Sequence, residues 1–91
     1  MKIRVEFYGI PRQRAGTAEA DVTIPADDAR LADVLRRLAA DFPALAETCI
    51  ETDRLKAGCA VNVNGERFVT DRAARMVDGE TLLFMSADMG G

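Results

Sequence analysis

The sequence contains no histidine, and this absence excludes several kinds of active site. Histidine is the usual general base at neutral pH, a common metal ligand and the partner of nucleophilic serine or cysteine in hydrolases. The two cysteines, Cys49 and Cys59, form neither a Cys-x-x-Cys motif nor a zinc pattern, so we expect buried or half-buried thiols without a chemical role. A self-contained hydrolase or transferase site is hard to build from this chain, and we expect no bound metal.

The chain also lacks long runs of apolar or basic residues. No apolar stretch has the length of a membrane span, and residues 1–6 alternate charged and apolar side chains, unlike the core of a signal peptide. The 12 Lys and Arg residues are dispersed along a chain of net charge −3. A phosphate-binding surface would need a basic patch. We therefore expect a cytoplasmic protein that binds neither membranes nor nucleic acids.

The length and composition predict one small globular domain over residues 1–91. The chain has 91 residues, of which 48% are hydrophobic and 30% are charged, as in ordinary soluble domains. A chain of this size buries about 60–65% of its unfolded surface, which is enough for one modest core. No internal repeat, low-complexity segment or linker divides it.

Alternation of apolar and polar residues predicts a β-hairpin at the start of the chain. Ile3, Val5 and Phe7 alternate with polar or charged residues, which indicates a half-buried strand. Residues 19–24 repeat this pattern and most simply pair with the first strand. The intervening residues 9–16 contain proline and several polar side chains, so we predict a turn there.

One apolar stripe at helical spacing predicts the main helix. Its members follow the i, i+3, i+4, i+7 pattern: Leu31, Val34, Leu35 and Leu38. Asp27 and Asp28 precede the stripe, where an N-cap is expected. Pro43 ends the helix near Asp41, because the residue before proline avoids the α region. Residues 44–58 are predicted to form a loop with a short helical turn.

A second hairpin is centred on Asn64-Gly65. Asn-Gly is the strongest short hairpin signal, since both residues tolerate positive φ. Alternation over residues 61–63 predicts the incoming strand, and residues 66–69 predict a short returning strand.

A further turn at Asp78-Gly79 precedes the last predicted strand, residues 81–85. This strand lacks alternation, which is typical of a central strand, so we expect it beside the first strand. The resulting order is two strands, one helix and three strands. We therefore predict an α+β, β-grasp (ubiquitin-like) fold, with a mixed sheet of four to five strands and one main helix on one face.

The sequence ends in Gly90-Gly91, and we expect residues 86–91 to form a flexible tail. Neither glycine has a Cβ, so such a tail could thread a narrow channel and present its carboxylate to another enzyme. Chain ends are often frayed in any case, so the two glycines alone do not decide between these interpretations.

Taken in order, these segments resemble the MoaD/ThiS family of ubiquitin-like sulfur carriers, and the MoaD type in particular. The resemblance extends over nearly the whole chain and rests on Val5-Glu6-Phe7-Tyr8, the helix 31–38 with Phe42-Pro43 after it, Val61-Asn62-Val63-Asn64-Gly65-Glu66, Asp78-Gly79-Glu80 and the terminal Gly90-Gly91. One departure is Met85-Ser86-Ala87, where many MoaD-type tails carry Phe-Pro-Pro, and this affects which partner the tail fits.

The resemblance implies a function that depends on other enzymes. A ubiquitin-activating-type enzyme (MoeB/ThiF-like) would use ATP and Mg²⁺ to adenylate the carboxylate of Gly91, and a sulfur donor would convert it to a thiocarboxylate. Gly90 would keep the channel clear. The small protein would then donate sulfur in molybdopterin synthesis as the partner of a MoaE-like large subunit. It would be no enzyme on its own and would hold no permanent cofactor.

Several residues are candidates for contact with these partners. The tail segment that a partner would recognise is Ser86, Ala87, Asp88 and Met89. Tyr8 points away from the predicted core and is a candidate for a partner-facing surface, as is Phe68. Phe7 shares the alternation of the buried positions and is expected in the core.

Three other functions remain open at this point. The carrier could supply thiamin thiazole, cysteine or another sulfur metabolite. The protein could be a ubiquitin-like modifier joined to lysines through Gly91. It could also be a β-grasp interaction module in which Gly90-Gly91 is incidental.

Overall fold

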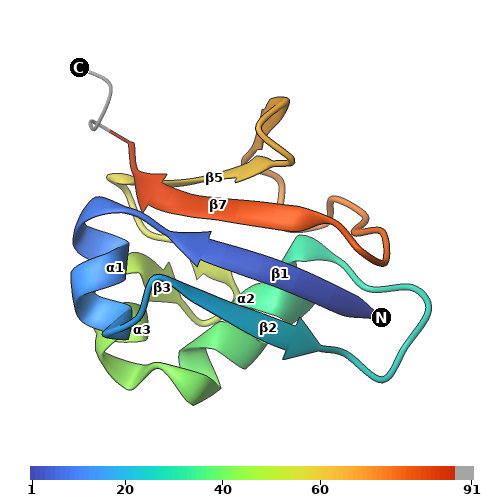
Figure 1. Cartoon of the computed structure of the whole chain (residues 1–91), viewed down its shortest axis with the longest axis horizontal. Coiled ribbons are helices and arrows are strands. Elements are labelled where there is room, and N and C mark those ends of the chain that lie inside the picture. Colours follow the sequence, from blue (N-terminus) through green and yellow to red (C-terminus); the bar gives the residue numbers. More distant parts are fainter. Residues whose placement is uncertain (88–91) are drawn as a thin grey trace.

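In the computed structural model, which describes residues 1–87, a mixed sheet carries its helices on one side (Figure 1). In chain order the elements are β1 (Lys2–Phe7), α1 (Gly9–Ala15), β2 (Glu19–Thr23), α2 (Leu31–Asp41), α3 (Pro43–Cys49), β3 (Ile50–Glu51), β4 (Arg54–Leu55), β5 (Cys59–Val63), β6 (Arg67–Val69) and β7 (Thr81–Ser86). The short strands β3 and β4 form a hairpin separate from the five-stranded sheet.

The first and last strands lie side by side in the centre of the sheet. The strand order is β2-β1-β7-β5-β6, in which β1 and β7 are parallel and the other neighbours are antiparallel. In the parallel pair, Val5 lies opposite Leu82 and Phe7 lies opposite Phe84. This arrangement confirms the predicted β-grasp, including the initial hairpin and the position of the last strand beside the first.

The core lies between the sheet and α2. The buried side chains from the strands and from α2 include Ile3, Val5, Phe7, Val22, Val61, Val63, Leu82 and Phe84, with Leu31, Val34, Leu35 and Leu38. The Phe7 ring centroid lies 5.5 Å from that of Phe42 and 6.3 Å from that of Phe84. Burying each large apolar side chain contributes about 1.5–3 kcal/mol. The predicted helical stripe and the core position of Phe7 are confirmed.

Strand β7 is apolar along its length but has only one fully buried side. Leu82 and Phe84 are buried toward the helices, whereas Leu83 and Met85 are half-buried on the opposite side. The strand is central because it has neighbours on both edges, although helices cover only one of its sides. The second side of the sheet is therefore open.

The start of α2 contradicts the prediction that Asp27 or Asp28 caps it. The N-cap is Arg30, whose backbone N–H donates to Oδ2 of Asp33 at 2.8 Å. An acid at this third helical position satisfies the exposed N–H and suits the helix dipole. Arg30 also pairs through its backbone with Arg75, so a long-range bridge fixes where the helix begins. The predicted end at Asp41 is confirmed.

The turn predicted at residues 9–16 is wrong, because residues 9–15 form helix α1. Pro11 lies in the first turn, where backbone N–H groups have no partner within the helix and a missing one costs nothing. Gly16 has a φ of 75° and its N–H donates to the carbonyl of Arg12 at 3.0 Å, which is a helix C-cap. Pro11 and Gly16, which suggest a turn in the sequence, instead mark the first turn and the C-cap of a short helix.

The segment 44–58 is also more regular than predicted. Pro43 stops α2 and begins α3, since proline is favourable at the first helical position. Leu45 and Cys49 of α3 are buried one turn apart. The β3–β4 hairpin follows. Within residues 1–87, no helix is long and apolar enough to cross a membrane.

The predicted second hairpin is confirmed. Asn64 and Gly65 have φ values of 57° and 73°, and the N–H of Glu66 donates to the carbonyl of Val63 at 2.9 Å, so these two residues form the centre of the turn. Strands β5 and β6 pair on either side of this turn, with Val61 opposite Val69.

Replacement of Leu35 tests the packing of α2. Leu35→Ala should lower the free energy of unfolding by about 2–5 kcal/mol, because the side chain is fully buried and its removal leaves a cavity. Urea denaturation followed by circular dichroism measures the change. Arg37→Ala, on the exposed side of the same helix, is the control and should change the value by less than about 1 kcal/mol. Equal midpoints for Leu35→Ala and the wild type would contradict the packing.

Candidate functional site

The C-terminal end of β7 is held against the start of β5. Ser86 is the last residue of β7, is buried and lies opposite Cys59. The next residue, Ala87, donates its N–H to the carbonyl of Gly58 at 2.7 Å. The sheet therefore extends into the first two residues of the segment that we predicted as a tail.

The other predicted tail residues lie outside the described part of the chain. These are Asp88, Met89, Gly90 and Gly91. What the structure supplies is the position from which they start, at the end of a central strand.

Helix α1 lies next to this position. The backbone N–H of Tyr8 donates to the carbonyl of Phe84 at 2.9 Å, which ties the start of α1 to the last strand. Figure 1 shows α1 at the same end of the molecule as the C-terminal end of β7. Tyr8 is 39% exposed, as its predicted surface position requires, and Ile10 is 46% exposed. Sequence reasoning misses Ile10 because it treats residues 9–16 as a turn.

The open side of the sheet carries an apolar surface beside the same position. We call it the open-face patch, and it consists of Tyr8, Ala60, Phe68, Leu83 and Met85. Ala60 lies opposite Met85, while Asn62 lies opposite both Leu83 and Phe68. Residues in register share one side of a sheet. Phe68 is 65% exposed, and exposed apolar surface of this kind is typical of protein-binding sites.

Asn62 lies in the middle of the open-face patch. Its side chain is buried, and its Oδ1 atom has no hydrogen-bond partner among residues 1–87. Most buried polar atoms do have a partner. Sequence reasoning assigns Asn62 only to a strand before a turn, because nothing local shows that β6 and β7 pack on both sides of it.

The other half of the open side is charged. Arg4 of β1 forms ion pairs with Glu6, at 3.4 Å, and with Glu19 of β2. The Tyr8 hydroxyl donates to Oε1 of Glu6 at 2.6 Å, and this bond is the main cause that lowers the pKa of Glu6. The same bond raises the pKa of Tyr8, because a phenolate would face the carboxylate. Tyr8 is thereby held at the border between the charged half and the open-face patch.

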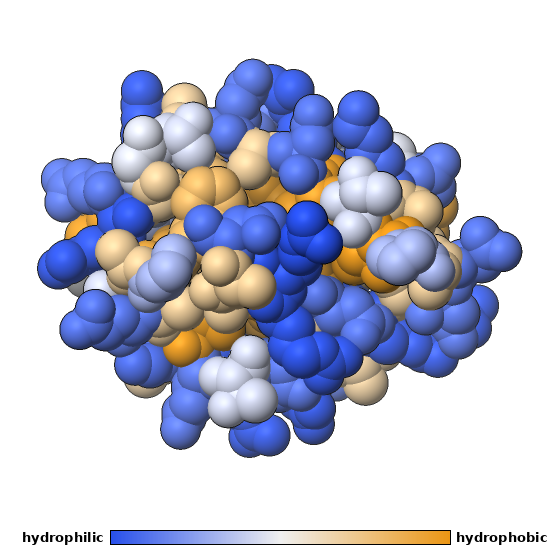
Figure 2. Space-filling model, turned by 90° about the horizontal axis from the view of Figure 1, so that it is seen from below, coloured by the Kyte–Doolittle hydropathy of each residue, from blue (hydrophilic) through white to orange (hydrophobic). Residues whose placement is uncertain are grey.

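The helix side of the molecule has a different surface. Seen from below Figure 1, hydrophilic residues separate the apolar areas (Figure 2). Arg36 and Arg72 both pair with the nearly buried Asp53 there, which ties α2 to the segment after β6. In the part of the chain that the structure describes, no three His, Cys, Asp or Glu side chains are grouped to hold a metal ion.

No protein-family model and no curated protein sequence matches this chain. Solved structures do match. The crystal structure of small archaeal modifier protein 1 (SAMP1) from Haloferax volcanii is 22% identical, with a TM-score of 0.81 and full coverage of both chains. The solution structure of the HVO 2177 protein of the same organism is 31% identical, with a TM-score of 0.78, and the match covers 100% of this chain and 87% of that one.

Two further matches are to complexes. One is the BexX/CysO complex of Amycolatopsis orientalis, at 22% identity and a TM-score of 0.71, covering 98% of this chain and 99% of the other. The second is the complex of subunits 1 and 2 of the molybdopterin-converting factor from Helicobacter pylori, at 19% identity and a TM-score of 0.63 over both full chains. At these identities the likeness shows the fold, and it agrees with the strand order described above.

Replacement of Tyr8 tests the electrostatics of the site. Tyr8→Phe should raise the pKa of Glu6 toward its usual value of 4.5, because the carboxylate loses its main hydrogen-bond donor. In the wild type the lowered pKa favours the folded state above pH 4.5, and this contribution is lost as the pH falls through the lowered value. NMR titration of the Glu6 carboxyl carbon measures the shift. An unchanged Glu6 pKa in the variant would contradict the assigned cause.

Proposed function

Since the chain shares the ubiquitin fold of MoaD/ThiS-like proteins, we propose that it is a sulfur carrier whose Gly91 bears sulfur as a thiocarboxylate. The observation that carries the proposal is the position of Gly90-Gly91. These residues follow closely after β7, the central strand of this fold, whose end lies beside an exposed apolar surface. A carrier needs both features: a reactive end without side chains, and a surface by which other proteins bind it.

The chemistry requires an activating enzyme, because a carboxylate is a poor electrophile and the chain has no histidine to act as a base. In the proposed reaction a carboxylate oxygen of Gly91 attacks the α-phosphate of ATP and displaces pyrophosphate, with Mg²⁺ held by the enzyme. A sulfide equivalent then attacks the acyl carbon and displaces AMP. The product is a thiocarboxylate whose sulfur is an exposed nucleophile. A MoeB/ThiF-like enzyme fits the first step.

The open-face patch is the proposed docking surface for that enzyme and for the sulfur acceptor. Binding must order the residues that enter the active site, and this costs free energy. A separate apolar contact offsets the cost. The patch begins at Met85, two residues before the last described residue, so a partner that covers it also lies beside the start of residues 88–91.

We favour molybdopterin synthesis as the destination of the sulfur, with a MoaE-like protein as the acceptor subunit. Support comes from the matching molybdopterin-converting factor, whose subunits 1 and 2 were solved as a complex. The BexX/CysO complex also joins a protein of this fold to a partner. Delivery to thiamin, cysteine or another sulfur metabolite uses the same Gly91 chemistry and differs only in the acceptor.

A ubiquitin-like modifier is the second candidate function. The observation in its favour is the likeness to small archaeal modifier protein 1, at a TM-score of 0.81. In that case the adenylated Gly91 would react with a lysine amine of another protein. Isopeptide adducts ending in Gly-Gly on cellular proteins would distinguish this function from sulfur transfer.

Intact mass measurement tests the carrier function directly. The protein should exchange one oxygen for one sulfur when incubated with ATP, Mg²⁺, a sulfide donor and an adenylating enzyme of the MoeB/ThiF type, and fragmentation should place the change on Gly91. A variant without Gly91 is the control and should show no exchange, because its shortened end misses the active site. If adenylating enzymes from the source organism leave the folded protein unchanged, the carrier proposal fails.

The docking surface has its own test. Phe68→Ser should weaken binding to the adenylating enzyme by about tenfold or more while the fold is retained, because a largely exposed ring at the patch is lost. Val77→Ser is the matched control, since Val77 is 57% exposed but lies outside the patch. Isothermal titration calorimetry measures both. Equal affinity of the Phe68 variant and the wild type would show that the partner binds elsewhere.

A further inference from the structure

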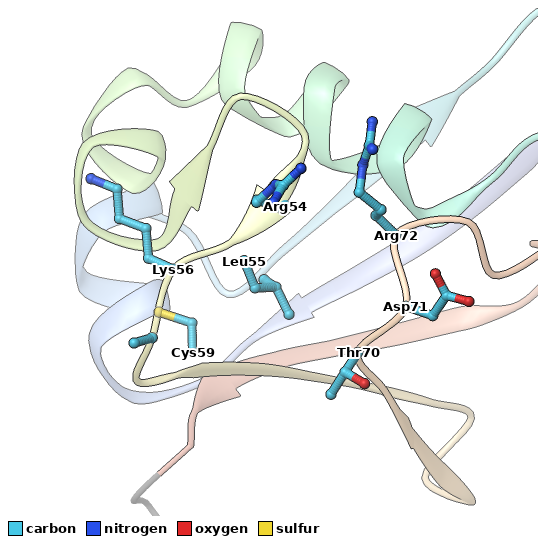
Figure 3. Close-up of a pocket in the computed structure, with 8 residues that line it drawn as sticks. Arg54, Leu55, Lys56, Cys59, Thr70, Asp71 and Arg72 are labelled. Carbon is cyan, nitrogen blue, oxygen red and sulfur yellow. The ribbon is translucent and has the colours of Figure 1, made fainter.

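A cavity of about 400 Å³ lies on the helix side of the sheet, between the β3–β4 hairpin and the segment after β6 (Figure 3). Its lining combines an apolar floor with a charged and polar rim: Arg54, Leu55, Lys56, Ala57, Cys59, Thr70, Asp71 and Arg72. The cavity is open to solvent and contains one thiol in its wall, that of Cys59. None of these side chains belongs to the open-face patch.

The fold brings a second thiol next to Cys59. Cys49 is fully buried in the core at the end of α3, and Cys59 packs against that core. Lys56 fixes the backbone of both cysteines, since its N–H donates to the carbonyl of Cys49 at 2.9 Å and its carbonyl accepts from the N–H of Cys59 at 3.2 Å. Cys59 is also one of the groups that raise the pKa of the Cys49 thiol. Cys59 therefore lines the cavity and packs against the core in which Cys49 is buried.

The rim of the cavity favours negatively charged ligands. Arg54 forms no ion pair within 4 Å among residues 1–87, although its charge helps to lower the pKa of the neighbouring Asp53. Lys56 donates through Nζ to the carbonyl of Glu47 at 2.6 Å and forms no ion pair with an acid among residues 1–87. Arg72 shares Asp53 with Arg36. Asp71 is the one acid among the cavity residues, which leaves an excess of positive charge.

We propose that Cys59 and Cys49 form a reactive dithiol site, entered through this cavity, that takes an anionic low-molecular-weight disulfide as its substrate. Arg54 and Lys56 attract the carboxylates of the disulfide, and the apolar floor accepts its carbon chain. This site is independent of sulfur transport at Gly91.

Two exchange steps account for all atoms and electrons. The Cys59 thiolate attacks one sulfur of the disulfide, so that a bond forms between Cys59 Sγ and that sulfur. The original S–S bond breaks, and the leaving thiolate takes up the proton that Cys59 lost. Cys49 Sγ then attacks Cys59 Sγ and expels the second thiolate, which takes up the proton of Cys49. Two protein thiols are oxidised by two electrons, and one small disulfide is reduced to two thiols.

The surroundings of Cys49 make the second step slower than the first at neutral pH. Burial raises the pKa of Cys49 to about 12, and the neighbouring Cys59 adds to this effect while Arg14 and Lys56 oppose it. Only a thiolate attacks a disulfide. The mixed disulfide on Cys59 therefore accumulates first, and closure to the Cys49–Cys59 disulfide accelerates as the pH rises.

Reaction of the folded protein with two disulfides of opposite charge tests the proposal. Glutathione disulfide is the anionic probe and cystamine is the cationic probe, and intact mass with peptide mapping follows both. Each rate on the folded protein is divided by the rate on the urea-unfolded protein, which removes the intrinsic reactivity of the probe. The normalised rate at Cys59 should be about three- to tenfold higher for the anionic probe. Cys49 should not form the first adduct.

Two variants distinguish attraction of the anionic disulfide by the charged rim from simple exposure of the Cys59 thiol. Arg54→Gln should lower the rate with glutathione disulfide about threefold, whereas the control Arg37→Gln, on the exposed side of α2, should not change it. At raised pH the wild-type adduct should give way to a protein two hydrogens lighter than the reduced form. Cys49→Ser should keep the adduct.

Equal normalised rates for the two probes would overturn the proposal, and so would first reaction at Cys49. Persistence of the adduct in the wild type at high pH would also overturn it. The comparison of the two probes uses the wild type alone, so it stands even if a variant fails to fold. Because the readout does not involve Gly91, failure here leaves the sulfur-carrier function untouched, and failure of that function leaves this result untouched.

Discussion

The parallel pairing of β1 with β7 is the contact on which the rest of the structure depends. It joins the two ends of the described chain in the middle of the sheet and aligns Phe7 with Phe84. Phe7 in turn contacts Phe42, the residue between α2 and α3, so the same row of rings connects the sheet to the helices. Strands β2 and β5 are each placed by pairing with one member of this central pair.

This pairing also gives the two sides of the sheet different environments, one covered by helices and one open. Helices cover the side that carries Leu82 and Phe84, because that is where the apolar stripe of α2 can be buried. The opposite side is left open, and its apolar half lies next to the end of β7. A protein that offers its C-terminal residues to other enzymes needs such a surface at that place. The surface used by the proposed carrier function is therefore created by the same contact that builds the core.

Sequence patterns predicted the regular elements where the pattern is long or the turn chemistry is specific. The stripe of α2, the alternation of β1 and the Asn64-Gly65 turn are of this kind. Sequence patterns failed for α1, since Pro11 and Gly16 fit a turn as well as a short helix. Only packing against α3 and β7 distinguishes these two structures. The cap of α2 was misplaced for a related reason, because the backbone of Arg30 is bound by a distant segment.

The candidate sites show the same division. Tyr8 and Phe68 could be proposed as surface residues from the sequence, and Gly90-Gly91 could be proposed as the reactive end from residue type and position alone. The sequence by itself determined the apolar periodicity of each element and the residue types at its turns and at the chain end, because these depend only on neighbouring residues. Only the tertiary structure decided that Leu83, Met85 and Phe68 share one surface and that Cys59 packs against the core that contains Cys49. Strand order and register arise from burial of the whole core, and that is a property of no local segment.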